Sequence, residues 1–120
     1  MPDDQILDMQ AIEGLRALSP GDGGVFVREL IEIYLQDTPK RLIELEQALA
    51  SQDAPAFARA AHTIKGSSSN FGAGRLSKLA LEIELQGKSG KLPASNESCV
   101  RLKAEYDLVA AALAPIAKSG

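Results

Sequence analysis

The chain has 120 residues, of which 45% are hydrophobic, 24% charged and 4% aromatic, and its formal net charge is −3. This length fits a single domain, residues 1–120, whose core we expect at about residues 24–117. The hydrophobic content excludes a disordered chain, and the acidic balance argues against a nucleic-acid binder. One cysteine, Cys99, excludes an internal disulfide, and with one histidine, His62, it excludes the usual zinc cages.

No segment has the roughly 20 consecutive apolar residues that a membrane span requires. The start of the chain, Met1-Pro2-Asp3-Asp4, has neither the basic region nor the apolar run of a signal peptide. We therefore expect a cytoplasmic protein that has no membrane partner.

The charged residues are unevenly distributed along the chain. From Arg59 to Lys91 there are six basic and two acidic residues, so this segment has a formal charge of +4 and the remainder has −7. A positive surface on an acidic protein suits an acidic partner or a phosphoryl group. A solvated helix face explains the count equally well.

The predicted elements are all helices, because no segment keeps the alternation of a β-strand and because helix-forming residues dominate the longer segments. Breaks rich in Gly, Pro and Ser are predicted at residues 19–24, 37–39, 51–55, 72–74 and 87–93. The resulting helices, about six in number, are two short ones near 4–18 and 24–36 and longer ones at about 39–51, 54–70, 73–87 and 96–117. We predict an all-α protein in which the four longer helices form an antiparallel up-and-down bundle, capped by the short N-terminal helices.

Local signals support these helix positions. Thr38 before Pro39 is typical of an N-cap followed by proline at the first helical position, and Asp53 before Ala54-Pro55 is a similar start. Apolar residues recur every three or four positions in the helices after Thr38 and after residue 96. These stripes are Leu42, Leu45 and Leu49, and then Cys99, Leu102, Tyr106, Val109, Leu113 and Ile116. Cys99 is thus interpreted as a small core residue.

The helix predicted from Ala54 contains the histidine. Its apolar stripe is formed by Phe57, Ala61, Ile64 and Ser68. His62 lies well over 90° from this stripe, near Arg59, Gly66 and Ser69, so its ring is expected to face water. A lone helical histidine is usually an unremarkable surface or core residue, and its neighbours must decide its role.

The neighbours of His62 favour a chemical role. Ala58 and Gly66, one turn away on either side, leave little bulk around the ring, so a partner has close access. The competing interpretation is that Gly66 ends the helix as a C-cap. Lys65, three residues after His62, is placed to neutralise a phosphoryl oxygen on the ring.

An exposed imidazole is largely neutral at cytoplasmic pH and offers a nucleophilic nitrogen without a dedicated base. Its other nitrogen then needs an acceptor on a neighbouring helix. Glu84 and Gln86, on the two flanks of the next helix, are both candidates. Leu81 and Leu85 lie off the apolar stripe of that helix, where they either form a docking surface or pack on the last helix.

Residues 61–68, Ala-His-Thr-Ile-Lys-Gly-Ser-Ser, and then Asn70-Phe71-Gly72-Ala73 resemble the signature of histidine-containing phosphotransfer (HPt) domains. Leu76, Leu79 and Glu82 also fit the pattern, so the resemblance covers most of residues 24–117. It implies a four-helix bundle that accepts a phosphoryl group from the aspartyl phosphate of one receiver domain and passes it to the aspartate of another.

Carried over by position, the resemblance makes His62 the phosphoryl acceptor. It implies that Lys65 stabilises the phosphoryl group, that Gly66 leaves space for the receiver and that Glu84 hydrogen-bonds the ring. Basic and polar residues near His62 are expected to guide docking, and they are Arg59, Ser69 and Lys78. The implied partners are receiver domains of response regulators or hybrid sensor kinases, which would supply Mg²⁺. The chain itself is expected to be a monomer with no cofactor or metal of its own.

Other functions are less well supported. Residues after His62 do not resemble a sensor-kinase dimerisation helix, so we expect no autophosphorylation with ATP. The run Gly87-Lys88-Ser89-Gly90 has Glu82 where a phosphate-binding loop needs its first glycine. The main rival is a helical adaptor, or a degenerate HPt-like module, that binds receivers without carrying phosphate. A purely structural scaffold leaves His62, Lys65 and Gly66 unexplained. The initiator methionine slightly favours a free-standing protein over a module of a larger kinase.

Overall fold

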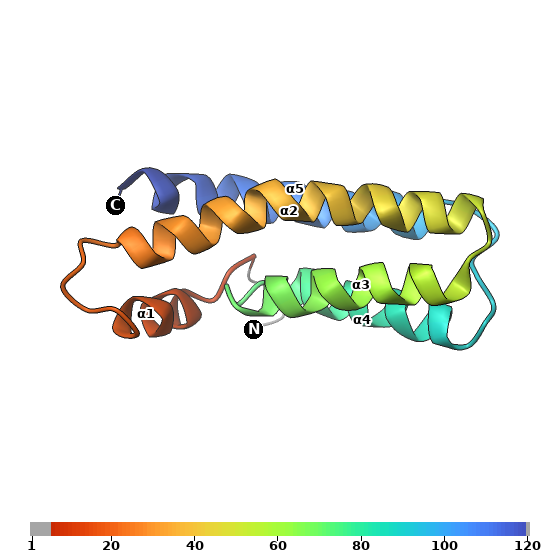
Figure 1. Ribbon diagram of the computed structural model, residues 1–120, viewed down its shortest axis with the longest axis horizontal. Coiled ribbons are helices and arrows are strands. Elements are labelled where there is room, and N and C mark those ends of the chain that lie inside the picture. The colour runs from red at the N-terminus through yellow and green to blue at the C-terminus, as the bar shows by residue number, and fades with distance from the viewer. Residues whose placement is uncertain (1–5, 120) are drawn as a thin grey trace.

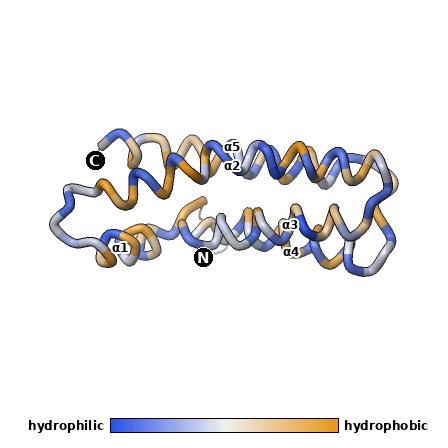
Figure 2. Tube along the Cα trace, in the orientation of Figure 1, coloured by the Kyte–Doolittle hydropathy of each residue, from blue (hydrophilic) through white to orange (hydrophobic). Residues whose placement is uncertain are grey.

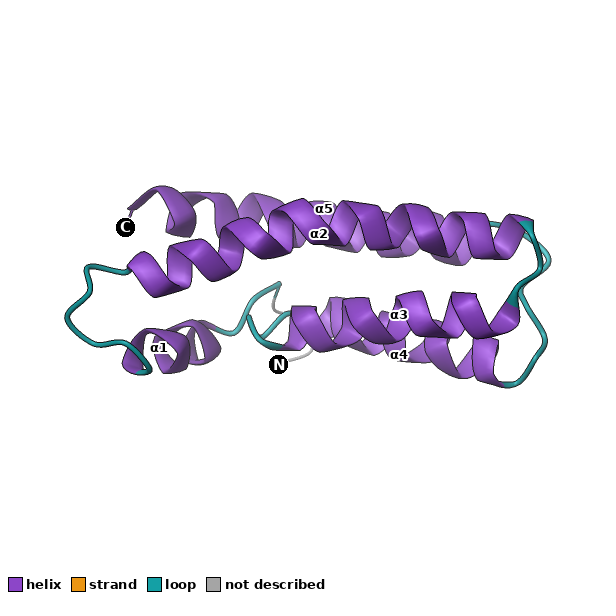
Figure 3. Cartoon of the chain, viewed as in Figure 1, coloured by secondary structure: helices purple, strands orange, loops and turns teal. Residues whose placement is uncertain are grey.

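The computed structural model describes residues 6–119, and every regular element in this range is a helix (Figure 3). Along these residues the helices are α1 (Met9–Ala17), α2 (Val25–Ala50), α3 (Ala54–Ser69), α4 (Gly74–Lys88) and α5 (Glu97–Ser119). From α2 to α5, each helix runs in the opposite direction to the one before it (Figure 1). The predicted all-α, up-and-down four-helix bundle is confirmed.

The four long helices enclose one core. α2 contacts α3 and α5, and α4 contacts the same two helices, so the bundle is closed. In Figure 1, α2 and α5 form one layer and α3 and α4 the other, while α1 lies beyond the end of the second layer and contacts α2. Short connections after α2 and α3 enforce this arrangement, because they return the chain beside the helix it has just left.

The apolar stripes predicted from the sequence form the core. Apolar and polar segments alternate along each helix (Figure 2), as expected for helices that bury one side. Both predicted stripes are buried, except that Ile116 is only partly buried. The Tyr34 ring packs on Phe71 and Tyr106 at centroid distances of 5.1 and 5.8 Å, and its hydroxyl lies 2.7 Å from Ser68 Oγ. This contact joins α2 to the buried stripe of α3.

The predicted break at residues 37–39 is wrong. α2 continues through Thr38 and Pro39, so the expected short helix near 24–36 and the helix at 39–51 are one element. Pro39 has no N–H to donate to the Leu35 carbonyl, but the Tyr106 hydroxyl of α5 donates to that oxygen at 3.4 Å. Because Thr38 is also buried, packing keeps helical a segment that local signals would end.

The N-terminal helix is shorter than predicted. Of the expected span 4–18, positions 4 and 5 lie outside the described residues, and α1 begins at Met9. Asp8 caps it by accepting a hydrogen bond from Gln10 N at 2.9 Å. The Asp8 amide donates to the Gly72 carbonyl at 3.0 Å, which attaches this start to the turn between α3 and α4. This tertiary contact holds the backbone before Met9 out of the helix.

Within residues 6–119, no helix combines the length and the apolar character needed to cross a membrane.

Candidate functional site

Helix α3 presents His62 to solvent. The helix starts at an N-cap, Asp53, whose side chain accepts from Ala56 N at 3.1 Å, and it continues past Gly66 to Ser69. The four residues of its predicted apolar stripe are buried. The His62 side chain, on the other side, is 64% exposed. The expectation that this ring faces water is confirmed, and Gly66 is not a C-cap.

One buried carboxylate binds the histidine ring. Glu84 on α4 is 2% exposed, and its Oε2 lies 2.9 Å from His62 Nδ1. Gln86, the other candidate acceptor, is exposed. Glu84 is therefore the group on α4 that contacts the ring.

Two lysines complete the polar cluster around this carboxylate. Lys65 Nζ lies 2.7 Å from Glu84 Oε1, and Lys88 Nζ lies 3.1 Å from Oε2, the oxygen that the histidine also contacts. A buried charge is tolerated when it is paired and hydrogen-bonded, and here three donors share two oxygens. We call His62, Lys65, Glu84 and Lys88 the Glu84 cluster.

The cluster keeps Glu84 ionised. The hydrogen bond from Lys65 is the largest cause that lowers the pKa of Glu84, and Lys88 and His62 lower it further. Burial acts in the opposite direction, but the resulting pKa is about 2. An ionised carboxylate can only accept hydrogen bonds, so it selects the tautomer with the proton on His62 Nδ1. The lone pair of the neutral ring is then on Nε2.

Lys65 lies in a different place from the one the sequence suggested. Its ammonium is bound to Glu84 rather than free beside the ring, and its side chain is 28% exposed. In this position Lys65 lowers the pKa of the carboxylate that binds Nδ1.

Gly66 is exposed, and a Cβ built on it would meet no atom of this chain within 4 Å. The fold itself therefore does not require glycine at this position. A helix-interior glycine costs about 1 kcal/mol of stability relative to alanine. Since no contact within the chain requires it, the glycine beside His62 is explained by the approach of another molecule to the ring.

Gly87 is required by the packing of α3 on α4. A Cβ at Gly87 would lie 2.9 Å from both the Cβ and the backbone N of Ala58. The two helices thus approach closely one turn before His62 on α3 and next to Lys88 on α4. The sequence placed Gly87 at the boundary between the predicted helix 73–87 and the predicted break 87–93, and it gave Lys88 no role. The spacing of Glu84 and Lys88, four residues apart on one helix, was the available signal.

The predicted docking residues are distributed around the site. Arg59 is exposed and lines the same hollow as His62. Ser69 is exposed two turns after His62, and its hydroxyl donates to the Lys65 carbonyl at 2.8 Å. Lys78 is exposed on α4 and is not among the groups paired with Glu84. Leu81 and Leu85 are also exposed, so neither is buried against α5.

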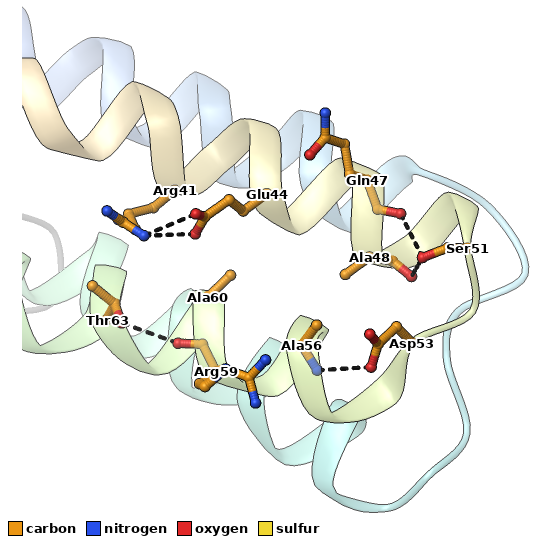
Figure 4. A pocket seen from close by; sticks show the side chains of 10 residues that line it. All are labelled: Arg41, Glu44, Gln47, Ala48, Ser51, Asp53, Ala56, Arg59, Ala60 and Thr63. Carbon is orange, nitrogen blue, oxygen red and sulfur yellow. Dashed lines mark hydrogen bonds and ion pairs between the residues drawn. The ribbon is translucent and has the colours of Figure 1, made fainter.

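A larger hollow of about 450 Å³ lies between α2 and α3 (Figure 4). Its wall on α2 includes Arg41 and Glu44, which are paired at 2.7 Å, and Arg59 lines it from α3. His62 does not line it. Its two hydroxyls, on Ser51 and Thr63, donate to backbone carbonyls and not to a base, so this hollow is a weaker candidate for chemistry than the surface around His62.

Among residues 6–119, no three or more His, Cys, Asp or Glu side chains are grouped so that they could hold a metal ion. The Glu84 cluster has a single carboxylate and two ammonium groups, a donor set that repels cations.

Fold and site together define a small four-helix bundle that presents one exposed histidine with its second nitrogen bound by a buried carboxylate. The sequence matches the Hpt domain family over residues 29–112, and the chain belongs to this family of histidine phosphotransfer domains of phosphorelays. The family resemblance found in the sequence is thereby confirmed.

The comparison of structures agrees with the family. The chain is similar to the crystal structure of histidine-containing phosphotransfer protein B (HptB) from Pseudomonas aeruginosa PAO1, with a TM-score of 0.87 and 25% sequence identity. The match covers 98% of each chain, so the entire bundle is shared. A sequence search of curated proteins found no significant match.

Proposed function

We propose that this chain is a phosphorelay intermediate that accepts a phosphoryl group on His62 from the aspartyl phosphate of one receiver domain and passes it to the aspartate of another. The observation that carries the proposal is the exposed ring whose Nδ1 lies 2.9 Å from the buried Glu84 carboxylate. This contact leaves Nε2 as the nucleophile on the exposed side of the ring.

In the proposed step, the lone pair of His62 Nε2 attacks the phosphorus of the aspartyl phosphate. The N–P bond forms while the bond from phosphorus to the aspartyl oxygen breaks, and the receiver's aspartate leaves as a carboxylate with the bonding electrons. The ring gains a positive charge, which the Glu84 carboxylate stabilises through Nδ1–H. The reverse step, on the aspartate of a second receiver, returns the neutral ring.

The surroundings of His62 support this role. Gly66 leaves the approach to the ring free of side-chain bulk. Arg59 adds a positive charge that complements the acidic pocket of a receiver, and Leu81 and Leu85 offer exposed apolar area on the adjoining helix. In this proposal the receiver supplies the Mg²⁺, and the chain acts as a cytoplasmic monomer without ATP-dependent activity of its own.

Receivers phosphorylated with ³²P-labelled acetyl phosphate test the proposal. We expect label to move to this chain in an acid-labile, alkali-stable linkage, and we expect His62→Gln to abolish the transfer. Lys103→Gln, which changes an exposed side chain on α5, is the control and should retain it. Receivers that bind the chain without transferring label would identify an adaptor instead.

A further inference from the structure

The hollow beside His62 contains a cation that the sequence did not single out. It has a volume of about 340 Å³ and is lined by Pro55, Ala58, Arg59, His62, Glu84 and Lys88. Lys65 is not part of its lining. Lys88 is therefore the lysine that shares this hollow with the histidine ring.

Distances place the Lys88 ammonium close to the ring. Nζ is 3.1 Å from Glu84 Oε2, and the same oxygen is 2.9 Å from His62 Nδ1. The ammonium is thus no farther than about 6 Å from Nδ1. The phosphoryl group is proposed on Nε2, and the flexible four-carbon stem of a lysine lets the side chain rotate and carry its charge from the carboxylate toward that group.

The packing of α3 on α4 produces this placement. Gly87 lets the α4 backbone lie against Ala58, one turn before His62. In the antiparallel pair, Glu84 then lies across from the histidine, and Lys88, level with Ala58, extends its side chain back along α4 to Glu84 Oε2. The position of Lys88 is thus determined by a contact between two helices.

Lys65 and Lys88 are held to Glu84 in unequal ways. Lys65 is 28% exposed and lies 2.7 Å from Oε1, whereas Lys88 is 62% exposed and shares Oε2 with the ring at 3.1 Å. An exposed ion pair is weak, so Lys88 is the lysine that a new anion can attract away. Glu84 keeps its hydrogen bonds from Lys65 and His62 after Lys88 leaves.

We infer that Lys88 binds the phosphoryl group carried by His62, and that Lys65 is a positioning residue that holds Glu84 and thereby the ring. This inference rests on the proposed phosphoryl transfer to His62. In the unmodified chain Lys88 rests on Glu84 Oε2. In the phosphorylated chain its ammonium forms an ion pair with phosphoryl oxygens in the hollow.

Phosphoramidate, a small-molecule donor, phosphorylates the full chain for the test without any receiver. ³¹P NMR then measures the pKa of the phosphoryl group. A neighbouring ammonium favours the dianion and lowers this pKa, so Lys88→Gln should raise it by about half a unit. Lys88→Arg should restore the original value. Lys91→Gln, which removes an equal charge from the following loop, is the matched control and should leave the pKa unchanged.

Lys65→Gln separates the two lysine roles. It should change the ¹⁵N shifts of the unmodified His62 ring, while it changes the phosphoryl pKa less than Lys88→Gln does. The inference is overturned if Lys88→Gln behaves like Lys91→Gln, if Lys65→Gln has the larger effect on the phosphoryl group, or if phosphoramidate does not label His62. Normal labelling together with no transfer from any receiver would refute the proposed relay instead.

Discussion

Two ion-pair clusters of this protein show how location determines what charges do. On α2, Arg41 binds Asp37 at 3.1 Å and Glu44 at 2.7 Å, so one cation has two carboxylates on a single exposed helix surface. In the Glu84 cluster one carboxylate binds cationic groups from α3 and α4, and it is almost completely buried. The first arrangement lies on the surface of one helix, whereas the second joins two helices and orients the histidine ring.

The physical basis of the difference is solvent. Water screens the Arg41 pairs, and both carboxylates are neighbours in sequence that meet the guanidinium whether or not the bundle forms. Glu84 has lost its hydration, and its hydrogen bonds to His62 and Lys65 of α3 exist only in the folded bundle. The comparison leads to three tests, given in order of decreasing expected effect on stability.

The largest effect is expected from Glu84→Gln, which keeps the shape of the side chain and removes its charge. Charge-assisted hydrogen bonds contribute about 1.5–3 kcal/mol each, so the free energy of unfolding at pH 7 should fall by about 2 kcal/mol. Phosphotransfer should slow at least about tenfold, because Nδ1–H loses its anionic acceptor. Urea unfolding and the receiver assay measure the two effects.

Glu44→Gln in the Arg41 cluster is the matched control for this change. It removes the same charge from an exposed pair, so we expect no resolvable loss of stability or of transfer. Equal losses in the two variants would show that burial of Glu84 is not what distinguishes the clusters.

The second test follows stability with pH. The pKa of Glu84 is lowered from 4.5 to about 2 in the folded protein. A lowered folded-state pKa contributes stability that is fully present above the unfolded value and is lost as the pH falls through the folded value. The stability difference between the wild type and Glu84→Gln should therefore shrink from about pH 4.5 downward and be nearly absent at pH 2. Urea unfolding at several pH values measures it, and a constant difference would contradict the assigned pKa.

The third test disrupts the close packing of α3 on α4, which brings the residues of the Glu84 cluster together. Gly87→Ala introduces a Cβ at 2.9 Å from Ala58, and overpacking of this kind costs about 1–3 kcal/mol. Alanine has a higher helix propensity than glycine, which offsets about 1 kcal/mol of this cost. We therefore expect the free energy of unfolding to fall by about 1 kcal/mol, as measured by thermal or urea unfolding. Transfer should also slow, because α4 moves away from the ring.

Gly66→Ala is the control for the glycine test. The added Cβ meets no other atom, so the substitution changes only the helix propensity. The free energy of unfolding should therefore rise by up to about 1 kcal/mol. The bulkier Gly66→Gln should fold normally and slow transfer from a receiver, because its side chain occupies the approach to His62. Loss of stability at Gly66, or unchanged transfer in Gly66→Gln, would refute the role assigned to the cleared surface.

Much of the site followed from helix periodicity, and the remainder depended on contacts between helices. The outward direction of His62 needed only the positions of Phe57 and Ile64 on the same helix. The choice between Glu84 and Gln86 stayed open, because it depends on how α4 is rotated and shifted along α3. Gly87 and Ala58 determine that register, and no pattern within one helix reports a contact between two.

The predicted break at Thr38-Pro39 failed for a similar reason. Cap and proline signals indicate a helix boundary only where no other part of the chain replaces the lost hydrogen bond. The missing donor at Leu35 is replaced by Tyr106, which is 71 positions away in the sequence. Such compensation is invisible until the chain is folded.

The amino-acid sequence by itself determined the helical class, the buried stripes and the exposed surface that carries His62, because these depend on a period of 3.6 residues that acts locally. Tertiary structure alone decided that α2 is continuous, that Glu84 binds Nδ1 and that the histidine ring shares a Glu84 oxygen with Lys88. These features depend on distances between atoms of different helices, and those distances exist only after the core has packed.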